Sequence, residues 1–253
     1  MGGRGGSLRN SHGVGGTPQA LAAKISRDPV AILRMSDAQA VSALDFIRSN
    51  SETSYSSGTQ QDTDTQRFVN WLGWGDTKPE VISEADFDAR VQQENAVTYY
   101  HTDDDYGGKQ GSDFNDQLMY GPNYLSGGIH GDGTYIASDA IDSRGYGSSQ
   151  VKLILNKKAK VISENDLGVK IAKLYKTKPK MMEAINNLSS GYVPGGNGHN
   201  KPAVKTLVAA MLGFNVIAAS GPHSFAGYHT ILDKSVMTIA NRKKPSYEVD
   251  QNW

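Results

Sequence analysis

The sequence predicts an α+β protein in which a mixed sheet is flanked by helices. Two observations carry this prediction. Apolar residues in the first third of the chain recur at helical spacing, whereas short β-rich runs appear after Asn95. Helices and long glycine-rich loops separate these runs at irregular intervals, which is not the pattern of repeated βαβ units. The 253 residues suffice for one large domain, or for one domain with an appendage.

Three regions are expected along the chain. Residues 1–27 are predicted to form a flexible arm, because residues 1–20 are rich in glycine and too poor in apolar side chains to offset the entropy of ordering. Residues 28–95 are predicted to form an N-terminal helical lead, interrupted by a polar, low-complexity linker near 50–65. Residues 96–253 are predicted to form the β-rich domain.

Capping residues and apolar spacing locate the elements within these regions. Ser36 with Gln39 predicts a capping box at the start of a helix. Ser83 and Ser163 predict two further helix starts. The predicted strands cover residues 96–101, 135–137, 151–155, 159–162, 214–218, 228–232 and 236–240. We expect the third and fourth of these strands to pair with each other.

The composition excludes several classes of function. Lys plus Arg number 26 and Asp plus Glu number 26, so no overall field attracts nucleic acid or an anionic membrane. The absence of Cys excludes disulfides, thiolate metal sites and a Cys nucleophile. The longest apolar runs are far shorter than a membrane span, and the N-terminus lacks the apolar core of a signal peptide. We therefore expect a soluble protein with no membrane partner, and we disfavour nucleic acid as a partner.

The segment from Gly127 to Tyr146 is where we expect a ligand site. Four glycines precede a short apolar strand, and glycine lets a backbone or a ligand approach closely. Two tyrosines, Tyr135 and Tyr146, lie eleven residues apart and would line a cleft with flat faces. The alternative interpretation is a glycine-rich hairpin loop with ordinary strand tyrosines.

Familiar catalytic and metal-binding patterns are missing from the sequence. Gly131 and Gly133 precede a strand and not a helix, so they do not form a dinucleotide-binding turn, and no lysine follows a phosphate loop. The histidines lack HExxH or Cys-His spacing, which disfavours a zinc site. No Gly-x-Ser-x-Gly elbow supports a serine nucleophile. The acidic run at 103–105 lacks an EF-hand pattern, and we expect a solvated loop there and no metal.

Three segments together resemble the ADP-ribosyltransferase superfamily, in the branch that has a His-Tyr-Glu triad. Tyr99-Tyr100-His101 resembles the family's first strand. The run Gly131-Asp132-Gly133-Thr134-Tyr135-Ile136-Ala137 resembles its Gly-x-Gly-x-Tyr-Phe-Ala segment. Ser143-Arg144-Gly145-Tyr146 resembles the Ser-x-x-Tyr that follows at the same spacing. The resemblance covers roughly residues 96–240, and it implies a split, mixed β-core that clamps NAD.

The resemblance implies a role for each matching residue. His101 would hold the adenosine ribose of NAD, Ser143 would bind the nicotinamide carboxamide, and Tyr146 would stack on the nicotinamide ring. Thr102 replaces a glycine of the family, and its backbone would still hold the carboxamide. The NAD-binding residues implied in this way are His101, Thr102, Gly131, Gly133, Tyr135, Ser143 and Tyr146. Structural roles stay open for the same residues: His101 as a half-exposed strand histidine, Tyr135 and Tyr146 as core tyrosines, and Ser143 as a loop serine. Arg144 either contacts the pyrophosphate of NAD or is a solvated side chain.

The chain departs from the family pattern on the last strand of the match. The segment from Tyr228 to Ser235 resembles the family's Glu-Tyr-Val-Val-Leu-Asn-Arg-Ser, so Tyr228 stands where the catalytic Glu is expected. That carboxylate stabilises a cationic, oxocarbenium-like transition state, and losing one such preorganised group costs on the order of 10²–10³-fold in rate. The catalytic positions are thus His101, Tyr135 and Tyr228. Tyr228 or His229 would replace the Glu; the competing interpretation is that each is an ordinary residue of the sheet.

The longer context resembles ADP-ribosyltransferase-like proteins of tailed phages and prophages, through Gln66-Arg67-Phe68, Lys78-Pro79 and the Gly-Arg-Gly opening. This resemblance implies transfer of ADP-ribose from NAD to a host protein or another macromolecule, in the virion or the host cytoplasm, with release of nicotinamide. Two alternatives stay open. One is a catalytically inactive virion component that binds other phage structural proteins, and the other is an NAD glycohydrolase. We expect loops 102–112 and 189–201 to form the docking surface for an acceptor.

Overall fold

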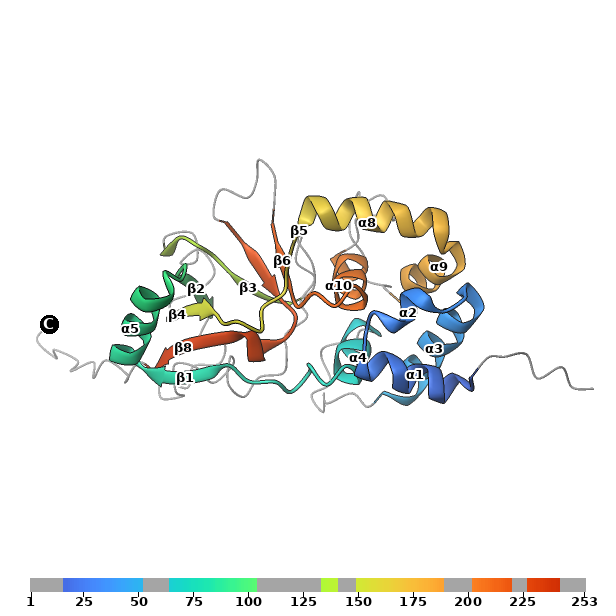
Figure 1. The fold of residues 1–253 in the computed structure, drawn as a ribbon, viewed down its shortest axis with the longest axis horizontal. Helices are drawn as coiled ribbons and strands as arrows, with labels where there is room; N and C mark the ends of the chain where they lie inside the picture. Colours follow the sequence, from blue (N-terminus) through green and yellow to red (C-terminus); the bar gives the residue numbers. More distant parts are fainter. Residues whose placement is uncertain are drawn as a thin grey trace, which may run out of the picture.

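The computed structural model describes residues 16–51, 64–103, 133–140, 149–188, 202–219 and 227–241, and it confirms the predicted α+β class. Within these residues the strands form two four-stranded sheets. Figure 1 shows the strands gathered in one half of the molecule and most of the helices in the other half. Helix α5 (Glu84–Glu94) is the exception, because it lies with the strands.

The helices begin where the capping serines predict. The Ser36 hydroxyl accepts from the Gln39 N–H at 3.3 Å, and the Gln39 side chain accepts from the Ser36 N–H at 2.9 Å, which confirms the capping box. Ser83 and Ser163 cap α5 and α8 through the N–H three residues on. The remaining helices are α1 (Pro18–Arg27), α2 (Ala31–Arg34), α3 (Asp37–Asn50), α4 (Asp64–Trp71), α8 (Glu164–Thr177), α9 (Pro179–Leu188) and α10 (Pro202–Met211), with a 3₁₀ turn η2 (Lys234–Val236). None of the described helices has the length and apolar character to cross a membrane.

Helix α1 corrects the predicted flexible arm over residues 1–27. The last ten residues of that stretch are helical, and the buried side chains of the helix are Leu21, Ala22 and Ile25. The indole N–H of Trp71 donates to the Ala22 carbonyl at 2.9 Å, which connects α1 to the C-terminal end of α4. Apolar residues at this spacing share one side of a helix, so α1 gains enough burial to fold against its neighbours. Residues 1–15 lie outside the described part of the chain.

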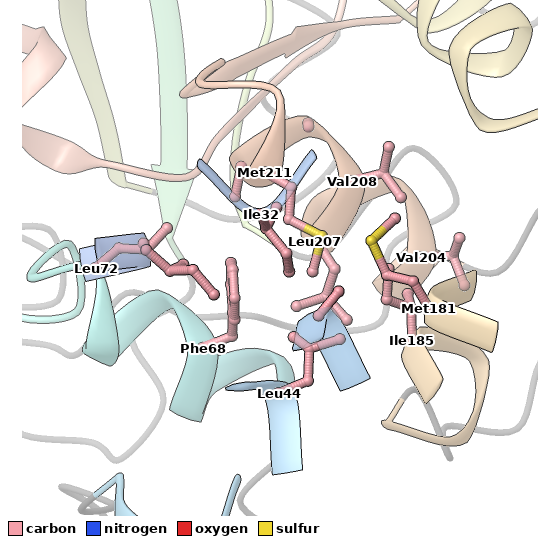
Figure 2. Close-up of a cluster of buried hydrophobic side chains, with 14 of the residues drawn as sticks. Ile32, Leu44, Phe68, Leu72, Met181, Ile185, Val204, Leu207, Val208 and Met211 are labelled. Carbon is pink, nitrogen blue, oxygen red and sulfur yellow. The ribbon is translucent and has the colours of Figure 1, made fainter. Parts of the chain in front are cut away.

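A large apolar cluster, which we call the helical core, joins helices from both ends of the chain (Figure 2). Leu44 of α3, Phe68 of α4, Met181 of α9 and Leu207 of α10 belong to it, and each is at most 1% exposed. N-terminal helices therefore pack directly on helices that follow the first strands in sequence. The predicted boundary between the helical lead and the β-rich domain, at 95/96, does not separate two packing units.

The sheets combine strands from distant parts of the chain. One sheet has the order β1-β8-β4-β2 and the other has the order β3-β7-β6-β5. The strands are β1 (Glu80–Ser83), β2 (Tyr99–Asp103), β3 (Thr134–Ile136), β4 (Ser149–Leu155), β5 (Val161–Ser163), β6 (Val216–Ala218), β7 (His229–Ile231) and β8 (Met237–Asn241). The sequence does not predict β1, which lies inside the predicted helical lead and pairs parallel with β8. This edge strand is mostly exposed and so lacks the alternation of a half-buried strand.

The predicted pairing of strands 151–155 and 159–162 is wrong. In the structure β4 pairs with β2 and β8, whereas β5 pairs parallel with β6 in the other sheet. The side chain of Asn215 explains the separation, because it accepts from the Lys160 N–H at 2.7 Å and donates to the Lys158 carbonyl at 3.2 Å. Asn215 immediately precedes β6, so these hydrogen bonds hold residues 158–160, which connect β4 to β5, beside β6.

The two sheets meet where β2 lies beside β3. Tyr100 and Ala137 exchange two backbone hydrogen bonds across this edge, at 2.7 and 2.8 Å. A second buried apolar cluster takes side chains from β3, β4, β6, β7 and β8, and so from both sheets. Strand β2 continues to Asp103, two residues beyond the predicted strand end at His101. His101 is consequently an internal residue of β2, close to the edge that faces β3.

Candidate functional site

Three of the predicted site residues come together on three adjacent strands. His101 lies on β2, Tyr135 lies on β3, and Tyr228 immediately precedes β7. Strand β2 contacts β3 through the Tyr100–Ala137 bridge, and β3 pairs with β7. We call the region formed by His101, Tyr135 and residues 227–230 the strand junction.

The imidazole of His101 is fixed by the backbone of β3. Its Nδ1 lies 2.6 Å from the carbonyl oxygen of Tyr135. A carbonyl only accepts hydrogen bonds, so the Nδ1 atom of His101 carries the hydrogen of this contact. Ala137, two residues on, turns its N–H and carbonyl toward β2, and the Tyr135 carbonyl points to the same edge. If the ladder between β2 and β3 continued beyond the Tyr100–Ala137 bridge, the Tyr135 carbonyl would accept from a backbone N–H of β2. The His101 side chain takes the place of that N–H.

Tyr135 and Tyr228 lie on the same face of their sheet. Tyr135 is paired with Thr230, and Thr230 with Ile217, which belongs to the helical core. Directly opposed residues of antiparallel strands share a face, so these three side chains point toward the helical core. The Ala219 N–H donates to the Tyr228 carbonyl at 2.8 Å and continues the β6–β7 ladder by one residue. Strand alternation then puts Tyr228 on this same side, which we call the core-side face.

His229 faces the opposite side of the sheet. Its ring lies against the Tyr99 ring, with centroids 4.8 Å apart, and the Tyr99 hydroxyl is 3.5 Å from its Nε2. Its Nδ1 donates to the Gly227 carbonyl at 2.9 Å. Burial lowers the pKa of His229 and raises the pKa of Tyr99, so both side chains are neutral at neutral pH. His229, considered as a replacement for the missing Glu, is therefore covered by Tyr99 and turned away from Tyr135.

Two glycines permit the close approach of β7 to β3. A Cβ at Gly133 would lie 2.6 Å from the Ile231 carbonyl oxygen and 2.6 Å from the Thr230 methyl carbon. Gly227 has a φ of +54°, and a Cβ there would lie 2.3 Å from the Ser138 hydroxyl oxygen. Side chains are excluded at both positions by contacts within the fold. The packing of β3 on β7 thus explains Gly133 without a ligand.

Thr230 lies at the strand junction, and the sequence did not indicate this position. Its side chain is fully buried and its hydroxyl has no hydrogen-bond partner. The only available signal is its register opposite Tyr135, which requires knowledge of strand pairing. A buried hydroxyl without a partner carries a desolvation cost of about 1–3 kcal/mol, so it calls for an explanation.

Carboxylates are absent from the part of β7 that faces the site. The segment from Gly227 to Leu232 contains no Asp or Glu. Asp233, the next residue, is buried and accepts from the Ser235 N–H at 3.0 Å, so it caps the 3₁₀ turn. Among the described residues, no group of three or more His, Asp or Glu could hold a metal ion.

The other predicted site residues lie outside the described part of the chain. These are Gly131, Ser143, Arg144 and Tyr146. Thr102 is described as part of β2, without its side chain. The loop predicted to dock an acceptor at 189–201 is likewise outside, as is nearly all of the loop at 102–112. The ligand-binding roles of these residues and the docking role of these loops stay predictions.

Comparisons with known proteins add little to this geometry. No protein-family model matches the chain, and no curated protein matches it. Among solved structures, the chain is similar to one described as the crystal structure of an anti-CRISPR protein, with 13% identity and a TM-score of 0.31. The match covers 57% of this chain and 95% of that chain. A TM-score this low supports no statement about fold or function, so the proposal below depends on the residues of the strand junction.

Proposed function

We propose that this protein is an NAD-dependent mono-ADP-ribosyltransferase, which transfers ADP-ribose to a host protein or another macromolecule and releases nicotinamide. The observation that supports this best is the grouping of His101, Tyr135 and Tyr228 on adjacent strands. These residues come from the three described segments that resemble the family. The proposed acceptor places the activity in the host cytoplasm, with delivery from the virion as the proposed route.

In the proposed reaction, the bond between C1′ of the nicotinamide ribose and the nicotinamide ring nitrogen breaks. Its electron pair leaves with nicotinamide, the acceptor's nucleophile forms a new bond to C1′, and the acceptor's proton passes to solvent. In this proposal His101 contacts a ribose hydroxyl through its imidazole, whose orientation is set by the contact of Nδ1 with the Tyr135 carbonyl. Tyr135 supplies an aromatic side chain on the core-side face, whereas His101 shares a face with its paired residue Val151 and lies on the other side of the strands. Both residues act by positioning, which lets a bound geometry replace a chance encounter.

The missing carboxylate sets an expectation for the rate. Tyr228 offers a hydroxyl where the family has a Glu, and a neutral hydroxyl stabilises an oxocarbenium-like transition state less than a carboxylate does. We therefore expect turnover on the order of 10²–10³-fold slower than that of a related enzyme with the carboxylate. The assay must accordingly run for long times and at high enzyme concentration.

The experiment is incubation of the protein with labelled NAD and a bacterial host lysate. We expect slow transfer of label to a macromolecule by the wild type, and at least a tenfold loss in His101→Ala, about the effect of one lost hydrogen bond with its positioning. His101→Asn is the matched variant, because its amide still reaches toward the Tyr135 carbonyl but lacks Nε2. Loss in both variants indicates that Nε2 contacts the ligand, whereas loss in His101→Ala alone indicates anchoring of the strands.

Three results would replace this proposal. NAD binding by calorimetry without label transfer or nicotinamide release would make the protein an NAD-binding component without catalysis. If neither binding, nicotinamide release nor transfer is detected, the enzymatic proposal is wrong and the inactive virion component takes its place. Release of nicotinamide without labelled macromolecule would identify water as the acceptor.

A further inference from the structure

The solvent side of helix α8 carries a stripe of lysines. Residues 167–182 contain five lysines and no Asp or Glu, although the whole chain has equal numbers of basic and acidic residues. Three of these lysines, Lys170, Lys173 and Lys176, lie on α8 and are exposed. Residues three apart are neighbours on the surface of a helix, so their side chains follow one another along α8. We call these three residues the lysine stripe.

The packing of α8 leaves the lysine stripe open to solvent. Leu167 and Ile171 are buried in the helical core and mark the opposite side of the helix. Val169, next to the stripe, is 71% exposed, and a Cβ at Gly168 would meet nothing within 4 Å. In Figure 1, α8 (yellow) runs along the outer edge of the helices. A large partner can therefore reach the stripe without any rearrangement of the fold.

The fold does not account for the lysines of the stripe. None of the three has an ion-pair partner among the described residues, whereas Nζ of Lys178, in the same run, donates to the Met35 carbonyl. Like charges three residues apart destabilise a helix slightly. Lys176 lies in the last turn of α8, where a cation offsets the helix dipole, but Lys170 and Lys173 lack that role. Their neighbouring charges thus point to a partner outside the chain.

The chemistry of the stripe favours a phosphate backbone over the other partners that a helix can bind. Lysine is depleted from protein–protein interfaces, whereas it is one of the two residues that neutralise phosphates in nucleic-acid complexes. Binding to a bilayer would require a free apolar face, and the apolar face of α8 is buried in the helical core. The stripe spans about 9 Å along the helix axis, a length over which duplex DNA presents about five phosphate charges.

We propose that the lysine stripe of α8 binds the phosphate backbone of nucleic acid. The overall charge of zero hides this surface, because it averages the stripe with acidic residues elsewhere in the chain. Contacts to phosphate carry no sequence information, so binding is independent of base sequence. The inference goes beyond the proposed function and does not involve NAD, so its test is independent of the transfer assay.

The test measures binding of the full chain to a fluorescently labelled DNA duplex of mixed sequence, by anisotropy between about 50 and 200 mM salt. Three phosphate contacts contribute about −2.7 to the slope of log Kobs against log salt. Lys170→Gln/Lys173→Gln removes two of them, so the slope should become shallower by about 1.8 and Kd should rise at least about tenfold at 100 mM salt. Lys170→Arg/Lys173→Arg keeps both charges and should bind within about twofold of the wild type.

Lys24→Gln/Arg27→Gln is the matched control. It removes two exposed cations, also three residues apart, from α1, which Figure 1 shows on the opposite side of the helices from α8. It should change Kd by less than about threefold. An equal loss in this control would show that binding follows the overall charge, and the inference would be wrong.

Three further results would overturn the inference. The first is a wild type that does not bind the duplex at the lowest salt. The second is Lys170→Gln/Lys173→Gln binding as tightly as the wild type while its circular dichroism is unchanged, which would assign the binding to another part of the chain. The third is binding to phosphatidylserine vesicles without binding to the duplex, which would make the partner a lipid surface.

Discussion

The helical core and the strand junction are built on opposite principles. The helical core consists of apolar side chains that are almost fully buried, such as Leu44, Phe68 and Met181, and they come from helices along much of the chain. At the strand junction, aromatic and histidine side chains are half-buried, and β2 meets β3 through one backbone bridge, supplemented by the His101 side chain. The first region has the composition of a packing unit, whereas the second contains half-buried polar and aromatic side chains.

This difference separates the residues that stabilise the molecule from those that carry its chemistry. Dense apolar packing makes a large contribution to stability, because each buried side chain removes area from water and fills space without voids. A junction with half-buried polar groups contributes less, but its groups can exchange internal contacts for contacts with a ligand. Substitutions in the two regions should therefore differ in which property they change.

The largest effect on stability is expected in the helical core. Phe68→Ala removes a ring that is 1% exposed in α4, and it should lower the free energy of unfolding by about 3–5 kcal/mol. Val169→Ala is the control, since Val169 is 71% exposed on α8 and should change stability by less than about 0.5 kcal/mol. Urea unfolding followed by circular dichroism measures both. A loss below about 1 kcal/mol for Phe68→Ala would mean that the helical core does not fold as one unit.

An intermediate effect is expected where β3 packs on β7. Gly133→Ala brings a Cβ within 2.6 Å of the Ile231 carbonyl oxygen, and a backbone atom in a sheet cannot move aside easily. We expect a loss of about 1–3 kcal/mol in the free energy of unfolding. Gly168→Ala provides the matched control, because a Cβ there meets nothing within 4 Å. In the interior of α8 it should raise stability by about 0.5–1 kcal/mol. An unchanged or higher stability for Gly133→Ala would contradict the close approach of the two strands.

The sequence predicts local features of this fold better than long-range ones. The capping box at Ser36 follows from residues three positions apart, and it was confirmed because the signal is local. The separation of β4 from β5 depends on Asn215, which lies more than fifty residues from its partners, and no local pattern contains that contact. Strand β1 is missed because an exposed edge strand has no apolar alternation to detect.

The same limit applies to the candidate site. Residues His101, Tyr135 and Tyr228 were nominated by resemblance, and the structure places them on adjacent strands. Neighbouring residues on one strand point to opposite faces, so Tyr228 and His229 cannot both lie on the face of the sheet that carries Tyr135, and this much follows from alternation alone. Which of them does so required the register of β7 on β3 and β6, and the same register identified Thr230.

The smallest effect is expected at the side of the junction where Tyr99 covers His229, and it appears only as the pH falls. Burial holds the pKa of His229 below its ordinary value near 6.5, so the unfolded chain takes up a proton at this residue before the folded chain does. Stability from this residue is therefore complete above pH 6.5 and declines as the pH falls from 6.5 toward the folded-state pKa. The loss should be smaller than that of Gly133→Ala, since it comes from one partly buried group.

His229→Asn isolates this contribution, because asparagine does not titrate and its amide can still donate toward the Gly227 carbonyl. The free energy of unfolding, measured by urea titration from pH 5 to pH 8, should fall less steeply below pH 6.5 in this variant than in the wild type. Tyr99→Phe is the companion variant, since it keeps a ring against His229 and should keep the steeper fall. Equal slopes for the wild type and His229→Asn would show that His229 is protonated as readily in the folded chain as in the unfolded one. In that case the Tyr99–His229 contact would be open to water.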